Sequence, residues 1–154
     1  MPKRLPRLFA APSESPGFLL WQAANRWQQR QRAALAPLGL TPVQFVLLAA
    51  VAALAEDDTP LTQARVARHT RADAMMTSQV VRGLERRKLV RRVPHPTDTR
   101  ARVLRPTAAG RKLARQAAYL VDDADRAFFE AVGADRARLG EALGALAGIG
   151  EEPV

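Results

Sequence analysis

The sequence predicts a mainly α-helical fold with one two-stranded β hairpin, and three observations lead to this prediction. Capping residues recur in front of segments whose apolar side chains are spaced three and four apart, as on one face of a helix. Two short β-like runs flank one turn that contains Pro and Asp. The 154 residues are 47% hydrophobic and 25% charged, a balance that is ordinary for one globular domain.

Three helices are predicted in the first half of the chain. Ser15-Pro16 and Thr41-Pro42 each place a capping side chain before a proline at the first helical position. These pairs predict helices over 16–36 and 42–54, with Gln44 at the capping-box position of the second. The second helix is apolar almost throughout, so we expect it to be buried on most sides. Thr62 caps a short helix over 63–69.

The second half begins with an amphipathic helix. After a turn at 70–72, Asp73 caps a helix that runs to about Lys88. Helical spacing assigns one face to the core (Thr77, Val80, Val81 and Leu84) and leaves the opposite face to Met75, Ser78, Gln79, Arg82 and Arg86. Strands over 89–93 and 101–105 follow, around a turn at 94–99. Thr107 caps a helix from 108 to about 132, and a last helix covers about 136–147.

The order helix, short helix, turn, helix and hairpin is that of a winged helix-turn-helix. In this architecture a helix fits the major groove of DNA, and the tip of the hairpin reaches the adjacent minor groove. We therefore predict a loose basic arm over 1–14, a winged helix-turn-helix region over 38–107, and helices at both ends, 15–36 and 108–150.

The positive charge is concentrated in this predicted region. The chain carries a formal net charge of +9. Residues 65–105 contain twelve Lys and Arg against three Asp and Glu, a difference that equals the whole net charge. Such clustering indicates a polyanionic partner, of which nucleic acid is the commonest. The alternative is that an arginine-rich composition reflects a GC-rich genome, which explains the preference for Arg over Lys but not the clustering.

Several other classes of protein are disfavoured. The chain has no cysteine, which excludes disulfides, thiolate metal sites and thiol redox sensing. Two histidines leave little room for a metal site, and no pattern for catalysis or cofactor binding is present. We interpret the acidic clusters at 56–58 and 122–125 as a flexible loop and a solvated helix face. No apolar run is long enough for a membrane span, and the N-terminal one is interrupted by polar residues, so we expect a cytoplasmic protein.

From about Gly17 to Ala131 the chain resembles the MarR family of transcriptional regulators. The resemblance rests on LGLTPVQFVLLAAVA (38–52), LTQARVARHTRADAMMTSQVVRGLERRKLVRRV (61–93) and HPTDTRARVLRPTAAGRKL (95–113). The wing pattern of the family is an acidic residue and Pro, then D-x-R, an alternating strand and L-T-x-x-G. Pro96, Asp98, Arg100, Thr107 and Gly110 match it. His95 departs from the pattern because it replaces the acidic residue, and Arg105-Pro106 replaces the residues before Thr107.

The resemblance implies an obligate homodimer in which helices 15–36 and 108–150 interlock. The residues themselves agree, because many large apolar side chains lie near the two ends of the chain, and exposing them to water would be costly. These are Phe18, Leu19, Trp21, Trp27, Phe128, Phe129, Leu139, Leu143 and Leu146. The alternative is that they form an ordinary intramolecular core.

The resemblance also implies that the helix from Asp73 enters the major groove of a pseudo-palindromic operator in double-stranded DNA. Its DNA-binding residues are then Met75, Met76, Ser78, Gln79, Arg82 and Arg86. Gln79 can pair with adenine, Arg82 with guanine or a phosphate, and the methionines can pack on thymine methyl groups. Ser78 is the expected phosphate contact. Core packing is the alternative for the two methionines.

In the wing, the resemblance implies that Arg100 enters the minor groove and that Asp98 steadies the hairpin by pairing with neighbouring arginines. The alternative is an exposed salt bridge at the turn. Arg65, Arg68, Arg91 and Arg102 are either contacts to the DNA backbone or simply solvated.

The family further implies release from DNA by a small aromatic or phenolic effector. Candidates to line its pocket are Trp21, Asn25, Arg26, Phe45 and His69, with ordinary packing as the alternative for each. His95 either tunes DNA affinity near neutral pH or is a solvent-exposed bystander. Two other functions stay open: a sequence-tolerant architectural DNA-binding protein, and a basic winged-helix module that binds protein or RNA.

Overall fold

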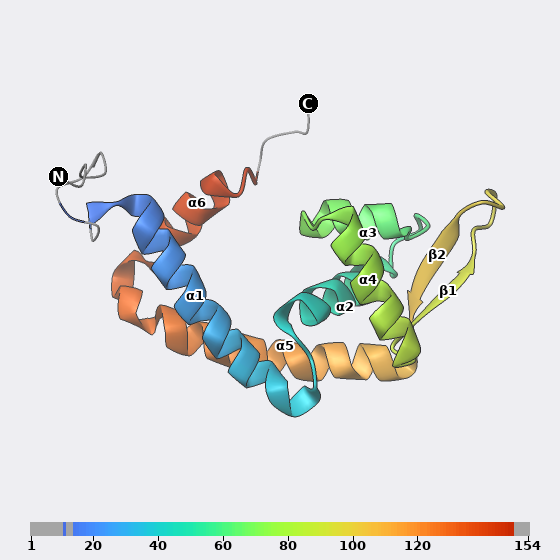
Figure 1. The fold of residues 1–154 in the computed structure, drawn as a ribbon, viewed down its shortest axis with the longest axis horizontal. Helices are drawn as coiled ribbons and strands as arrows, with labels where there is room; N and C mark the ends of the chain where they lie inside the picture. Colours follow the sequence, from blue (N-terminus) through green and yellow to red (C-terminus); the bar gives the residue numbers. More distant parts are fainter. Residues whose placement is uncertain (1–10, 12–13, 150–154) are drawn as a thin grey trace, which may run out of the picture.

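The computed structural model describes residue 11 and residues 14–149, and its helices are arranged along one long helix, α5 (Ala108–Phe129). At one end of α5 lies α1 (Pro16–Leu35), and at the other lie α2 (Pro42–Leu54), α3 (Gln63–Thr70) and α4 (Ala74–Arg86) (Figure 1). Strands β1 (Val90–Pro94) and β2 (Arg102–Pro106) form an antiparallel hairpin that projects beyond α4. A 3-10 helix (Glu130–Asp135) leads to α6 (Arg136–Leu146). The predicted mainly α-helical winged helix-turn-helix is confirmed.

The predicted helix caps are present. The Thr41 hydroxyl accepts a hydrogen bond from the Gln44 N–H at 3.2 Å, and the Gln44 side chain accepts one from the Thr41 N–H at 3.0 Å. This reciprocal pair is the predicted capping box, and it satisfies two backbone donors that the helix itself leaves unpaired. The side chains of Ser15, Thr62, Asp73 and Thr107 each accept a backbone N–H in the same way.

The main hydrophobic core lies where α2, α3, α4, the hairpin and α5 meet. Its fully buried side chains include Leu47 and Leu48 of α2, Val66 of α3 and Leu104 of β2. On α4, Thr77, Val81 and Leu84 are buried and Val80 is half-buried. This packing confirms the core face predicted for α4, and it fixes which face of α4 points outward.

Several predicted boundaries differ by one to three residues from those in the structure. Helix α4 ends at Arg86 rather than Lys88, because Lys88 takes a positive φ of 57° and the Leu89 N–H then bonds to the Leu84 carbonyl at 2.9 Å. Helix α5 ends at Phe129 rather than about 132, in front of the 3-10 helix. Each strand begins one residue later than predicted.

The junction between α5 and the wing requires glycine at position 110. The Thr107 hydroxyl donates to the Lys88 carbonyl at 2.8 Å, and the Thr107 N–H donates to the Leu89 carbonyl at 3.0 Å. These bonds hold the first turn of α5 against β1. A Cβ on Gly110 would lie 2.0 Å from the Leu89 carbonyl oxygen, so no larger residue fits without moving the backbone.

A carboxylate on α5 joins that helix to α1. Asp125 Oδ1 accepts hydrogen bonds from Trp27 Nε1 at 2.7 Å and Gln31 Nε2 at 2.6 Å. The predicted solvated face is therefore wrong for Asp125, although Asp122 and Asp123 are exposed. The spacing of the acidic residues concealed this role, since both partners come from a helix more than ninety residues earlier.

No single helix in the described part of the chain is long and apolar enough to cross a membrane. Segments 16–38 and 42–54 together meet the length and composition test for a span, but they are bent by 70° from one another. The predicted arm lies outside the described residues except for Ala11 and Glu14.

Candidate nucleic-acid interface

The outward face of α4 carries the residues that the sequence predicted for it. Met75 is 72% exposed and Met76 is 37% exposed, so neither methionine is a core residue in this chain. Gln79, Arg82 and Arg86 are exposed, and Ser78 is half-buried. The Asp73 carboxylate accepts the Met76 N–H at 2.9 Å and fixes the first turn of the helix. The arrangement presents a mixed polar, cationic and thioether face.

The tip of the hairpin is held by local hydrogen bonds. Asp98 Oδ1 accepts the Arg100 N–H at 2.9 Å, and the Ala101 N–H donates to the Asp98 carbonyl at 3.1 Å. In the described chain, the Asp98 carboxylate forms no ion pair, so the expected pairing with neighbouring arginine side chains is wrong. Asp98 instead shapes the backbone turn, as short acidic side chains often do. The Arg100 side chain is left exposed at the tip.

A basic cleft of about 320 Å³ lies between the wing and the start of α3. Arg92 reaches across the wing, with Nε 2.9 Å from the Glu85 carboxylate on α4 and Nη2 3.2 Å from Gln63 Oε1 on α3. Gln63 and Arg92 were not among the predicted site residues, because their roles depend on contacts between separate elements. The cleft is lined by Thr62, Gln63, Ala64, Arg92, Arg100, Ala101, Arg102 and Leu104.

The cluster of twelve basic residues divides into two groups. Some hold the fold together: Arg105 donates to the Ala55 carbonyl at 3.0 Å, and Arg87 donates to the Gly39 carbonyl at 2.8 Å. Others are exposed and, among the described residues, have neither an ion pair nor a side-chain hydrogen bond. This second group comprises Lys88 and six arginines, here called the free arginines: Arg68, Arg82, Arg86, Arg91, Arg100 and Arg102.

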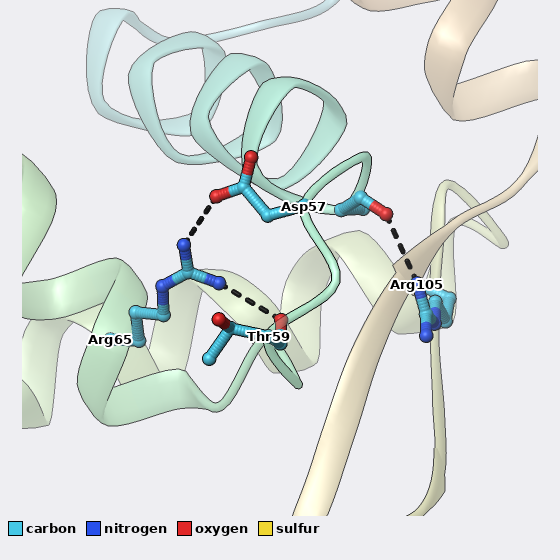
Figure 2. A network of polar contacts seen from close by, with 5 residues as sticks. Asp57, Thr59, Arg65 and Arg105 are labelled. Carbon is cyan, nitrogen blue, oxygen red and sulfur yellow. Dashed lines mark hydrogen bonds and ion pairs between the residues drawn. The ribbon is translucent and has the colours of Figure 1, made fainter.

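Arg65 belongs to the first group. Its guanidinium pairs with the Asp57 carboxylate and donates to the Thr59 carbonyl at 2.9 Å, as Figure 2 shows. The acidic loop is thus tied to the fold at two points, since Glu56 also pairs with Arg111 at 3.0 Å. Glu56 and Asp57 thus have ion-pair partners that the interpretation of this segment as a flexible loop did not include. Of the four arginines predicted as backbone contacts or solvated groups, Arg65 alone has intramolecular partners in the described chain.

Three of the five predicted pocket residues come together. Trp21, Asn25 and Arg26 line an open pocket of about 530 Å³ beside Leu19 and Phe128. Phe45 lies elsewhere, packed with Leu35, Leu40, Ala117 and Val121, and His69 is exposed on α3. The structure therefore does not bring those two residues to the same pocket.

Apolar side chains are exposed at the end of the molecule that carries α1 and α6. Trp21 is 64% exposed and Leu146 is 76% exposed, and Phe18, Leu19 and Leu143 are exposed as well. Trp27 is half-buried because it packs toward Asp125. So many exposed large apolar groups in one region are unusual for an isolated monomer.

Comparison with known proteins agrees with this geometry. A family model described as the MarR family matches residues 38–101. The uncharacterized HTH-type transcriptional regulator YdcH of Bacillus subtilis (strain 168) is 40% identical over 123 residues, which cover 80% of this chain and 84% of that protein. The HTH-type transcriptional repressor Rv2887 of Mycobacterium tuberculosis (H37Rv) is 33% identical over 109 residues, 71% of this chain and 76% of that one.

Solved structures share the whole architecture. The crystal structure of CouR from Rhodococcus jostii RHA1, bound to p-coumaroyl-CoA, superposes with a TM-score of 0.79 and 27% identity, covering 95% of this chain and 99% of that one. The relatives are named as regulators rather than as enzymes. The family model and these relatives agree with the exposed face of α4 and the basic wing. The chain therefore belongs to the MarR family of winged helix-turn-helix, DNA-binding transcriptional regulators.

Proposed function

We propose that this protein is a homodimeric, cytoplasmic transcriptional repressor that binds a pseudo-palindromic operator and leaves it when a small aromatic anion binds. The observation that carries the proposal is the shared exposure of Gln79, Arg82 and Arg86 on α4 and of Arg100 on the wing. A helix face with hydrogen-bonding groups suits the edges of bases in the major groove, and an arginine at a hairpin tip suits a narrow minor groove.

The exposed apolar residues of α1 and α6 support the homodimer. A second copy of the chain is the natural cover for them, because a two-fold interface places the same apolar patch on both partners. Burying a large apolar side chain contributes on the order of 1.5–3 kcal/mol. Leu146, which is 76% exposed, would therefore contribute on that scale in each chain.

The test of the homodimer is its dissociation on dilution. We expect one two-chain species at nanomolar concentration in analytical ultracentrifugation. Leu146→Glu should shift the protein toward monomer, because it introduces a charge into the proposed interface. Ala137→Glu is the matched control, since residue 137 lies on the opposite face of α6 and is exposed. A stable wild-type monomer, or equal effects of both substitutions, would contradict the proposed interface.

The free arginines support duplex binding through phosphates. Two copies of the chain would bring twelve of them to DNA, enough for the roughly six to ten phosphate contacts that lower affinity by about 10³–10⁵ between 50 and 200 mM salt. Arg91→Ala should reduce the slope of log affinity against log salt by about 0.9 per chain. Arg138→Ala removes an equal charge from α6, away from the wing, and should leave the slope unchanged.

The proposed function as a whole is tested by selection from a random duplex library, followed by salt titration on the selected sequences. We expect a two-fold palindrome with half-sites about one helical turn apart. Tight, steeply salt-dependent binding without an enriched sequence would instead favour the architectural role. Failure to bind any duplex would favour an RNA or protein partner.

The effector part of the proposal rests on the pocket beside α1. Its walls combine the aromatic rings of Trp21 and Phe128 with the guanidinium of Arg26, a combination that suits an aromatic anion. CouR binds p-coumaroyl-CoA, so p-coumarate and p-coumaroyl-CoA are reasonable first probes. We expect one of them to release operator DNA from the wild type, and Arg26→Ala to raise the concentration required at least tenfold. Release that is unaffected by Arg26→Ala would refute this pocket.

A further inference from the structure

We propose that His95 is a positioning residue of the wing, and that protonation of its imidazole weakens DNA binding. The neutral ring holds the turn that presents Arg100. The inference rests on the proposed function, in which Arg100 enters the minor groove. It concerns a feature of this chain in particular, because His95 stands where the family pattern has an acidic residue.

The imidazole of His95 lies inside the turn at the wing tip. Its Nδ1 is 3.1 Å from the backbone nitrogen of Asp98 and 3.3 Å from that of Thr97. The Thr97 hydroxyl is 3.4 Å from the same atom. The backbone N–H of His95 donates to the Ala101 carbonyl at 3.3 Å, and this bond closes the base of the turn. One ring nitrogen therefore faces the backbone N–H groups of two consecutive residues, Thr97 and Asp98.

This geometry requires one protonation state of the ring. A backbone N–H can only donate, so Nδ1 must be an unprotonated acceptor and the ring proton must lie on Nε2. Protonation of Nδ1 converts this acceptor into a donor that faces two backbone donors, and of the three groups around it only the Thr97 hydroxyl, at 3.4 Å, can accept its proton. Both backbone N–H groups then lose their partner, and the turn loses the hydrogen bonds that shape it. An aspartate or asparagine at this position would accept the same bonds through its side-chain oxygen.

A chain of hydrogen bonds links the ring to Arg100. His95 Nδ1 holds the N–H of Asp98, whose side-chain oxygen holds the N–H of Arg100 at 2.9 Å. Asp98 is thus fixed through both its backbone and its side chain. Releasing its N–H frees the residue that sets the direction in which Arg100 leaves the hairpin.

The charged groups around His95 belong to the wing. Asp98 and Arg100 are in the turn itself, and Arg102 lies opposite Pro94 in the strand register. The cleft beside the wing is lined by Thr62, which is the N-cap of α3, and by Gln63 and Ala64 of α3, none of which titrates. Arg92 of β1 lines the same cleft. An imidazolium would be repelled by the three arginines and attracted by Asp98. It would also be attracted by DNA phosphates, so the sign of the pH effect is the decisive observation.

The expected effect follows from the loss of one net hydrogen bond in each wing. A typical bond of about 1 kcal/mol corresponds to roughly fivefold in affinity, or about twenty-five-fold for two wings. An added positive charge near phosphates has the opposite effect and would tighten binding on acidification. A loss of affinity at low pH therefore identifies the positioning role.

The test measures operator affinity at pH 8.0 and 5.5 in a His69→Gln background, which removes the other histidine. We expect the background protein to bind roughly twenty-five-fold more weakly at pH 5.5 than at pH 8.0. Adding His95→Asn should make affinity tight and independent of pH, and adding His95→Ala should make it weak and independent of pH. Affinity of the background protein that is unchanged or higher at pH 5.5 would overturn the proposal. So would equal affinity of the Asn and Ala variants at pH 8.0.

A second measurement needs no DNA. The ¹⁵N chemical shifts of the His95 ring at pH 8.0 should show a proton on Nε2 and none on Nδ1. The opposite tautomer would overturn the proposed turn whatever the DNA affinity. If the chain binds no duplex at either pH but shows the expected tautomer, the proposed function fails and the effect on DNA binding fails with it. The hydrogen-bonding role of His95 in the turn would then still be supported.

Discussion

Removing the Asp125 carboxylate should loosen the whole junction between α1 and α5. Asp125→Ala deletes the acceptor of the Trp27 indole N–H at 2.7 Å and of the Gln31 amide at 2.6 Å. Gln31 is only 2% exposed, so its amide cannot turn to water after the substitution. The perturbation therefore leaves a buried donor without a partner, which costs more than the loss of an exposed hydrogen bond.

The magnitude follows from these two bonds. Hydrogen bonds to a charged group contribute roughly 1.5–3 kcal/mol each, and an unsatisfied buried group costs about 1–3 kcal/mol. Trp27 is half-buried, so its indole N–H can recover part of its bond from water. We expect the free energy of unfolding to fall by about 2–4 kcal/mol per chain.

The assay is urea unfolding of both proteins at the same concentration, because association also contributes to apparent stability. Asp123→Ala is the matched control. It lies two residues away on the same helix, and its only described ion pair is an exposed one with Arg126 at 3.4 Å. The control should change stability by less than about 0.5 kcal/mol. If Asp125→Ala is no more destabilising than Asp123→Ala, the reasoning about the α1–α5 junction is refuted.

Three further predictions concern the interface and its support. Arg100→Ala should weaken operator binding more than tenfold without changing the unfolding curve, and equal binding would remove Arg100 from the proposed minor-groove contact. Gln79→Ala should relax base preference at one position of each half-site, as measured by selection on the variant, because it removes a bidentate partner for adenine. An unaltered preference profile would refute that role. Gly110→Ala should lower the midpoint of thermal unfolding by several degrees or prevent folding, because the alanine Cβ would overlap the Leu89 carbonyl. A variant as stable as the wild type would show that α5 and the wing can move apart at this junction.

Features that depend on neighbouring residues were predictable from the sequence. The Thr41–Gln44 capping box is an example, because both partners lie within one helical turn and their chemistry determines the bond. The core face of α4 was predictable for a similar reason, since the helical period places Thr77, Val81 and Leu84 together. The exposed face of α4 follows from the same period.

Features that depend on distant residues were not predictable. Asp125 follows two other aspartates, and nothing in that local pattern distinguishes the one that meets Trp27 and Gln31. Phe45 was one candidate for the same pocket as Trp21, with ordinary packing as the alternative. Packing instead places Phe45 beside Ala117 and Val121 of α5. The angle at which two helices cross determines which of their side chains come into contact, and one sequence does not give this angle.

The arginine-rich segment contains both the proposed DNA contacts and the structural groups that position them. Arg91 and Arg92 are adjacent and equally charged, yet Arg92 bridges Glu85 and Gln63 while Arg91 is a free arginine. Because successive strand residues point to opposite faces, one of the two must turn toward α3 and α4. That tether fixes the separation between the wing and the outward face of α4. Net charge therefore indicates a polyanionic partner, whereas the spacing at which the free arginines would meet phosphates in the proposed complex depends on Arg92, which is held by Glu85 and Gln63.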